Sequence, residues 1–248
     1  MRTVWKQDFP DTIIDRALKD ATTHPLYLKA KNGDVKSGYF LARDLVTQRA
    51  IQQLNQLVID KKKTVIVPVH ALETISINMI PLAISQVLSA HLGIPICTDI
   101  VQSTKVSRTS KDGWYRVANS PRFKGDFPAG YHAIILDDTQ TQGGTLAALK
   151  GFIEYQGGEV IASYALTGKQ YSKQLRLSTN TLKTLRENYG TLEEWFIEQK
   201  GYSFACLTEW EARFILNSRR TPDAVRNILF EKELKGRIER NPKLEELT

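Results

Sequence analysis

The chain has 248 residues, a net charge of +7 and a hydrophobic content of 42%, which together predict a soluble globular protein with a sizeable core. No apolar run approaches the ~20 residues of a membrane helix, and the opening residues, MRTVWKQDFPD, lack the apolar stretch of a signal peptide. Two cysteines in no CxxC pair, Cys97 and Cys206, suggest neither a disulfide framework nor a zinc site, so we expect a cytoplasmic protein that binds no membrane.

The positive charge is concentrated at the two ends of the chain and in one internal stretch. Residues 1–63 hold twelve Lys and Arg against seven Asp and Glu, and residues 169–248 hold fifteen against twelve. Residues 64–168 are nearly neutral, but within them residues 101–124 hold six basic side chains and one acid. A short basic stretch indicates a small polyanion more than a long nucleic acid, so nucleic acid is the less favoured partner.

The chain is predicted to continue from its N-terminal segment into a hairpin and a helix. Residues 26–41 contain two runs with strand character around the turn Asn32-Gly33-Asp34, which predicts a β-hairpin. Residues 43–60 place Leu45, Ile51 and Leu54 at helical spacing, which predicts a helix.

The middle of the chain alternates between strand and helix patterns. The predicted elements are a strand at 64–69, a helix at 76–92, strands at 94–98 and 133–136, a helix at 144–156 and a strand at 159–166, with a long polar stretch at 99–130. Such alternation is typical of an α/β fold with a parallel sheet and helices on both faces. Right-handed crossovers bring the loops that follow the strands to one edge, where folds of this kind bind ligands.

The alternation stops after Gly168, which divides the chain into a predicted core, residues 1–168, and a helical C-terminal extension, residues 169–248. Two helices of the extension have clear starts, one at Thr208 and one at Thr221, which precedes a proline. The aromatic side chains of the extension are predicted to pack between helices rather than to stack on a base; they are Trp195, Phe196, Trp210 and Phe214.

Residues 133–149, AIILDDTQTQGGTLAAL, pass from an apolar strand through two carboxylates and a polar loop into a helix. If the strand ends at Leu136, the loop lies at a helix N-terminus, where unpaired N–H groups bind phosphate. Gly143 and Gly144 allow close approach of the backbone, and Thr141 and Thr145 can donate hydroxyls. The carboxylates suit hydroxyl groups, because an ionised carboxylate accepts hydrogen bonds. A phosphate at one end and a diol at the other describe a ribose 5-phosphate.

The stretch AIILDDTQTQGGT resembles the binding motif for 5-phosphoribosyl-1-pyrophosphate (PRPP) in type I phosphoribosyltransferases. The run TVIVPVHALET, followed by a helix and LGIPI, resembles the strand, pyrophosphate loop, helix and second strand of that family. The basic stretch 101–124 occupies the place of the family's flexible catalytic loop. The resemblance covers residues 64–168 and implies an α/β fold, a type I phosphoribosyltransferase-like parallel sheet flanked by helices, to which the N-terminal hairpin and the helical C-terminal extension are added.

The resemblance also implies roles for particular residues. Asp137 and Asp138 would hold the ribose hydroxyls and, mostly through PRPP and water, Mg²⁺. The PRPP site would be completed by Thr139, Gln140, Thr141, Gln142, Gly143, Gly144 and Thr145. The pyrophosphate loop would include Val69, His70, Ala71 and Glu73, and the catalytic residues would be Lys105, Arg108 and Asp138.

The implied activity is that of a glycosyltransferase of nucleotide metabolism, which moves phosphoribosyl from PRPP to a nitrogenous acceptor such as a nucleobase and releases pyrophosphate. Mg²⁺ would be its cofactor, and a homodimer is expected. Catalysis would consist of positioning and electrostatic stabilisation, with the basic stretch as a lid that excludes water.

Departures from the family pattern leave an alternative open. The pyrophosphate loop, VHALETIS, lacks the glycines usual in the family, and Gln142 stands where a small residue is common. The alternative is a non-catalytic PRPP-binding regulator, which binds nucleic acid through its basic ends or a partner subunit through its helical C-terminus. Thr141 stands where the hypoxanthine–guanine enzymes have an aspartate, which disfavours that acceptor class.

Overall fold

The computed structural model describes residues 1–70, 78–103 and 111–241, and it centres on a four-stranded sheet in the order β1-β6-β5-β2. Its strands are β1 (Ile13–Arg16), β2 (Thr64–Pro68), β5 (His132–Gln140) and β6 (Glu159–Gly168). Each neighbouring pair runs parallel, so the carboxyl ends of the strands share one edge. A second, antiparallel pair is formed by β3 (Val101–Gln102) and β4 (Phe123–Lys124).

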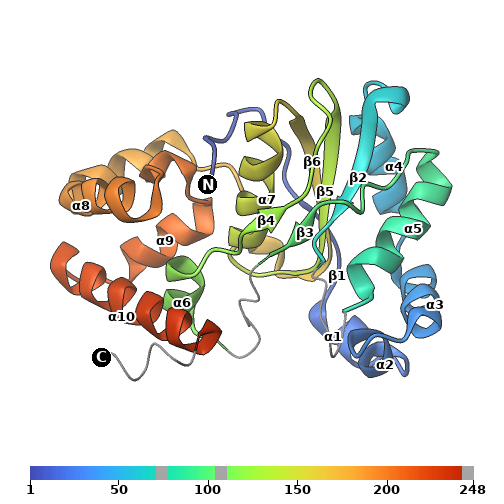
Figure 1. The fold of residues 1–248 in the computed structure, drawn as a ribbon, viewed down its shortest axis with the longest axis horizontal. Helices are drawn as coiled ribbons and strands as arrows, with labels where there is room; N and C mark the ends of the chain where they lie inside the picture. Colours follow the sequence, from blue (N-terminus) through green and yellow to red (C-terminus); the bar gives the residue numbers. More distant parts are fainter. Residues whose placement is uncertain (71–77, 104–110, 242–248) are drawn as a thin grey trace.

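Helices cover the sheet on both sides, and a further group lies beyond α7 (Figure 1). The first part of the chain contributes α1 (Leu18–Thr22), α2 (Tyr27–Lys31), α3 (Val35–Leu45), α4 (Gln48–Leu57) and α5 (Ile80–Leu92). The remainder contributes α6 (Gly113–Ala118), α7 (Gly144–Tyr155), α8 (Thr179–Lys200), α9 (Glu209–Asn217) and α10 (Pro222–Arg240). Within the described residues, no helix is both long enough and apolar enough to span a bilayer.

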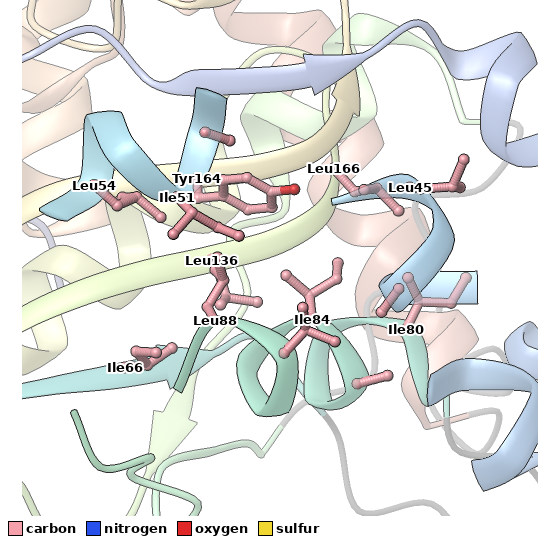
Figure 2. Close-up of a cluster of buried hydrophobic side chains, with 14 of the residues drawn as sticks. Leu45, Ile51, Leu54, Ile66, Ile80, Ile84, Leu88, Leu136, Tyr164 and Leu166 are labelled. Carbon is pink, nitrogen blue, oxygen red and sulfur yellow. The ribbon is translucent and has the colours of Figure 1, made fainter. Parts of the chain in front are cut away.

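One face of the sheet packs against α3, α4 and α5 (Figure 2). Leu136 and Tyr164 from neighbouring strands contact this helical layer, which contributes Leu54, Ile84 and Leu88. Each of these side chains is fully buried, and burial of a Leu or Ile side chain contributes roughly 1.5–3 kcal/mol. This packing fixes the position of α5 and of the residues just before it.

The other face of the sheet packs against α7 and the N-terminal segment. Val67 and Ile135 on this face meet Leu149 and Ile153 of α7, and Trp5 closes the same cluster. Alternate residues of each strand therefore point to two different helical layers. The side chain of any residue in β5 is thus assigned to the α5 face or the α7 face by its place in the strand.

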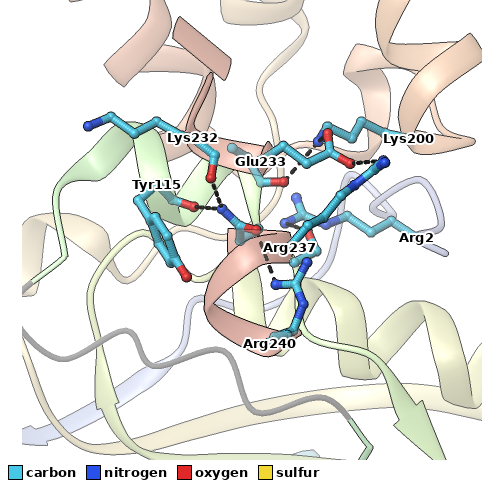
Figure 3. Close-up of polar contacts among 10 residues, drawn as sticks. Arg2, Tyr115, Lys200, Lys232, Glu233, Arg237 and Arg240 are labelled. Carbon is cyan, nitrogen blue, oxygen red and sulfur yellow. Dashed lines mark hydrogen bonds and ion pairs between the residues drawn. The ribbon is translucent and has the colours of Figure 1, made fainter. Parts of the chain in front are cut away.

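The C-terminal helices α8, α9 and α10 form their own core, which α6 joins through Val117 and Ala118. Polar contacts reinforce α10, as Figure 3 shows. Glu233 pairs with Lys200 and accepts from Arg237 at 2.7 Å, and Arg240 donates to Asn119 Oδ1 at 3.2 Å. The boundary between a core at 1–168 and an extension at 169–248 stays a prediction.

Several predicted elements are confirmed. The strands at 64–69, 133–136 and 159–166 correspond to β2, β5 and β6, and the helix at 144–156 to α7. Thr208 and Thr221 cap α9 and α10, since their side chains accept from the N–H groups of Glu211 and Ala224. The parallel α/β sheet and the helical C-terminus are therefore as predicted.

The predicted hairpin at residues 26–41 is wrong, because this segment forms α2 and the first half of α3. The turn at Asn32-Gly33 ends one helix and starts the next: Gly33 has a φ of 102°, and the Asp34 carboxylate accepts from Ser37 N at 2.7 Å. Leu41 and Leu45 are buried against α5 at helical spacing. The alternation of the sequence, which suggested strands, did not reveal this spacing.

Two further boundaries differ from the prediction, and strands β1, β3 and β4 were not predicted. The helix expected at 43–60 is divided between α3 and α4, because the Thr47 side chain accepts from Ala50 N and starts a new helix. The strand expected at 94–98 is reduced to a single bridge between Ile66 and Ile96. Strand β1 was not predicted, since its four residues are too short to show a period.

Candidate functional site

The candidate site lies at the carboxyl edge of the sheet, where β5 passes into α7. The prediction that the strand ends at Leu136 is wrong, because β5 continues to Gln140. Its pairing with β6 runs on through Thr139 and Gln140, and the hydroxyls of Thr139 and Thr167 lie 2.8 Å apart. Asp137 and Asp138 are consequently part of a strand and not of a loop.

Although side chains alternate along a strand, the carboxylates of Asp137 and Asp138 stay within hydrogen-bonding range of each other at this edge. Asp138 lies on the α5 face, where its Oδ2 accepts from Lys31 Nζ at 2.6 Å and from Asn78 Nδ2 at 2.7 Å. The Asp138 side chain is 12% exposed and that of Lys31 is 35% exposed. Burial of the ammonium disfavours its charge, but the charge of Asp138 and the hydrogen bond to it outweigh that effect and raise the pKa of Lys31.

The Asp137 Oδ1 accepts from the backbone N of Asp138 at 2.8 Å, and the Asp137 carboxyl lies within hydrogen-bonding range of that of Asp138. Burial raises the pKa of Asp137 well above its usual value, and the neighbouring charge of Asp138 raises it further. The two adjacent acids therefore differ in chemistry. Asp138 is paired with a cation, whereas Asp137 binds a proton more readily than an ordinary aspartate.

The loop between β5 and α7 is held from behind by the C-terminal part of the chain. Gly143 caps α7 with a φ of 78°, and a Cβ atom there would lie 2.2 Å from Leu175 Cδ2. The Thr208 hydroxyl donates to the carbonyl of Gln142 at 2.6 Å. These contacts fix the loop and leave the N-terminus of α7, which begins at Gly144, in a defined orientation.

A cavity of about 550 Å³ opens beside this loop. Thr139, Gln140, Thr141 and Gln142 form one wall, and Gly168 and Lys169 from the end of β6 form another. The remaining lining side chains come from elsewhere in the chain and are Ala17, Leu18, Gly113, Arg116, Tyr171, Trp210, Phe214 and Asn217. The cavity therefore joins the sheet edge to α9.

Aromatic rings dominate the far side of the cavity. Tyr171 and Trp210 meet edge to face with centroids 4.6 Å apart, and Phe214 contacts Trp114 at 4.7 Å. Trp195 and Phe196 pack among the C-terminal helices as predicted. Phe214 also packs against the core of the C-terminal helices as predicted, and both Trp210 and Phe214 line the cavity, which was not predicted. This long-range placement left no signal in the local sequence.

Three polar atoms around the cavity lack a hydrogen-bond partner among the described residues. They are the carbonyl oxygens Oε1 of Gln140 and Gln142 and the indole N–H of Trp210. The orientation of the Gln140 amide is fixed, since its Nε2 donates to the carbonyl of Ser172. Buried polar atoms are normally paired in native proteins, and because these three atoms are themselves buried, they mark polar positions in the cavity wall rather than exposed contact points.

The pyrophosphate-loop residues Val69 and His70 follow β2 at the same edge. Val69 N donates to the carbonyl of Leu136 at 2.8 Å, and His70 is buried, with its own carbonyl accepting from Gln102 N at 2.8 Å. Ala71, Glu73, Lys105 and Arg108 lie outside the described residues. Sequence reasoning missed Lys31 and Asn78, because the predicted hairpin gave residue 31 no reason to approach the motif.

A magnesium ion fits this edge only together with a bound phosphate. In the described part of the chain, no three His, Cys, Asp or Glu side chains gather closely enough to hold a metal ion. Mg²⁺ is commonly held by one or two carboxylates plus substrate phosphates and water. Asp137 and Asp138 can supply those carboxylates, so the donor set agrees with a metal that arrives with its ligand.

Comparison with known proteins gives two relatives by sequence and solved structures of limited similarity. No protein-family profile matches the chain. A Haemophilus influenzae protein described as uncharacterized is 59% identical over 153 residues, 62% of this chain and 34% of that protein. Protein TraN of Escherichia coli is 36% identical over 221 residues, 89% of this chain and 49% of that protein. The chain thus spans about a third and about half the length of these two curated relatives.

The similar solved structures include phosphoribosyltransferases. Adenine phosphoribosyltransferase from Rhodothermus marinus has 14% identity and a TM-score of 0.34, covering 60% of this chain and 83% of that one. UMP synthase from Leishmania donovani has 14% identity and a TM-score of 0.33, covering 73% of this chain and 33% of that one. Similarity of this extent assigns no activity to the chain.

Proposed function

We propose that the chain binds PRPP with Mg²⁺ and transfers its phosphoribosyl group to a nitrogenous acceptor with release of pyrophosphate. The observation that carries the proposal is the meeting of three features at one sheet edge. A carboxylate pair precedes a loop at the N-terminus of α7, and that loop forms a wall of an aromatic cavity. These are the features that a sugar phosphate and a flat acceptor require.

The 5-phosphate is assigned to the backbone between Thr141 and Thr145. The N–H groups at the start of α7 have no partner within the helix, and the helix dipole favours an anion there. Gly143 supports this role because its positive φ turns the chain into the helix. Asp137 and Asp138 are assigned to the ribose hydroxyls, and Mg²⁺ bound there would neutralise charge on the diphosphate.

The acceptor is assigned to the cavity. A volume of about 550 Å³ accommodates a nucleobase-sized ring, and apolar pockets with a few convergent polar groups are the usual form of small-molecule sites. The rings of Trp210 and Phe214 offer apolar contact to a flat acceptor. Lys105 and Arg108 remain assigned to the leaving pyrophosphate, where their loss should reduce kcat more than affinity.

The test is pyrophosphate release from PRPP and Mg²⁺ with a panel of nucleobases. We expect release with at least one base, and binding of PRPP that is tighter with Mg²⁺ than with chelator and tighter than binding of ribose 5-phosphate. Trp210→Phe, which replaces an indole that lines the cavity with a smaller ring, should raise the KM for the acceptor, whereas Trp195→Phe should not. Binding of PRPP without release for any base would support the regulator instead, and absence of PRPP binding would overturn both.

A further inference from the structure

Lys31 is a cation that the fold, and not the motif, brings to the candidate site. It ends α2, and the neighbouring Ala30 carbonyl accepts from Met79 N at 3.1 Å, which fixes the end of α2 beside the start of α5. Asn78 is held in the same place, since its Oδ1 accepts from Ile80 N at 3.2 Å. Lys31 and Asn78 thus reach Asp138 from two separate segments.

The ion pair leaves part of each group available. Lys31 and Asn78 both donate to Oδ2 of Asp138. An ammonium has three N–H donors. One is used by Asp138, and within the part of the chain that the structure describes the other two meet no acceptor, on a side chain that is 35% exposed. An anion can therefore bind Lys31 without breaking its contact with Asp138.

The positive charge of Lys31 offsets the negative charge of Asp138 beside the proposed anionic ligand. A carboxylate beside a diphosphate repels it, and Asp138 lies three residues before Thr141, where the loop assigned to the 5-phosphate begins. Lys31 neutralises that carboxylate and adds donors on the face of the sheet away from α7. The run that follows β2, VHALETIS, contains no glycine. Its backbone therefore has fewer ways than a glycine-rich loop to turn N–H groups onto a diphosphate, which increases the need for a side-chain cation there.

We propose that Lys31 is a binding residue for the anionic group at C1 of the sugar, and that it selects a sugar diphosphate over a sugar carrying only the 5-phosphate. The inference rests on the proposed function, since it names a residue for the diphosphate of the same ligand. Lys31 contacts the diphosphate through its remaining N–H groups while it holds Asp138 in position.

The experiment compares affinities of PRPP and of ribose 5-phosphate, by calorimetry with Mg²⁺ present, for four proteins. Lys31→Met removes the charge, Lys31→Arg keeps it, and Lys29→Met removes an exposed charge from the same helix as a control. Because Lys31→Met loses a charge-assisted hydrogen bond, it should bind PRPP roughly ten- to a hundredfold more weakly than the wild type does. Its affinity for ribose 5-phosphate should fall by less than about threefold. Lys31→Arg should restore most of the loss, and Lys29→Met should match the wild type.

The inference would be overturned if Lys31→Met lost equal affinity for both ligands, or lost none. The proposed function would remain intact in either case, provided that the wild type binds PRPP. A wild type that binds no PRPP would overturn both. If Lys31→Met does not fold, Lys31→Gln serves in its place, since its amide can still donate to Asp138 without a charge. Lys31→Gln is then expected to lose selectivity for PRPP, and retained selectivity in that variant would count against the inference.

Discussion

At the scale of single residues, Asp137 and Asp138 show that neighbours in a chain need not share an environment. Asp138 contacts Lys31 and Asn78, whereas Asp137 accepts from the backbone N–H of Asp138. Asp138 is paired with a cation, whereas burial and the adjacent charge of Asp138 disfavour the ionised form of Asp137. The same substitution should therefore have different consequences at the two positions.

Asp137→Asn should stabilise the free protein at pH 7 relative to the wild type, but not near pH 4. The folded pKa of Asp137 lies above its ordinary value of 3.8, so the wild type loses stability as the pH rises from that value to the folded pKa. Asparagine removes this loss and keeps an Oδ1 that accepts from Asp138 N. Denaturant unfolding at the two pH values checks this, and a pH-independent difference would contradict it.

Asp138→Asn should instead weaken binding of PRPP about ten- to a hundredfold, because a charge-assisted hydrogen bond to the ribose is lost. Asp137→Asn should weaken it as well if both carboxylates hold hydroxyls, as the motif implies. Calorimetric titration of the two variants measures this. Unchanged affinity in both would remove the carboxylates from the site.

At the scale of elements, the loop between β5 and α7 depends on contacts with segments far along the chain. Gly143 combines a positive φ with close packing on Leu175, and Thr208 joins the loop to the cap of α9. The Thr208 hydroxyl therefore caps the helix that carries Trp210 and Phe214, and it also holds the loop assigned to the phosphate.

Gly143→Ala should cost more stability than Gly201→Ala. Both glycines have a positive φ, 78° and 72°, so alanine at either position pays roughly 1–2 kcal/mol for the left-handed conformation. Only at Gly143 would the new Cβ meet Leu175, which adds about 1–3 kcal/mol of overpacking, whereas nothing lies within 4 Å at Gly201. Urea unfolding of the two variants compares them directly, and equal losses would refute the steric argument.

Thr208→Ala should lower stability by about 1 kcal/mol for the lost cap and by roughly 1–3 kcal/mol more because the Gln142 carbonyl loses its donor. Thr221→Ala is the matched control, since Thr221 caps α10 from an exposed position and should cost only about 1 kcal/mol. Thr208→Ala should also weaken ligand binding, measured as above, and Thr221→Ala should not. Unchanged binding in Thr208→Ala would mean that the loop does not depend on its contact with α9.

At the scale of the whole molecule, Arg2 ties the N-terminus to the C-terminal helices. Its guanidinium donates to both carboxylate oxygens of Glu211, at 2.5 and 2.9 Å, and to Ser120 Oγ at 3.0 Å. Both partners of the ion pair are buried, with side chains 1% exposed. The pair lies next to the start of α7, because Arg2 also reaches the Gly144 carbonyl at 3.4 Å.

Arg2→Met should therefore destabilise the protein by about 3–5 kcal/mol, because it leaves the Glu211 carboxylate buried without its cation. Lys6→Met removes one half of a surface pair with Glu159 and should cost less than about 1 kcal/mol. Thermal and denaturant unfolding of the two variants test the contrast. Comparable losses would show that Arg2 does not join the two parts of the chain.

Local patterns in the sequence determined much of the fold and the position of the motif. Alternating strands and helices predicted the parallel sheet, and Thr208 and Thr221 predicted helix starts, because these signals depend on residues a few positions apart. The order carboxylates, glycines, helix likewise directed attention to the edge where β5 ends.

The tertiary structure decided which distant residues meet at that edge. Lys31 lies 107 positions before Asp138, and its approach depends on the packing of α2 and α3 against α5. The cavity forms because α9 lies opposite the ends of β1 and β6, so that Trp210 and Phe214 line one of its sides. Such contacts follow from how buried faces pair across the whole chain, and no short stretch of sequence records that pairing.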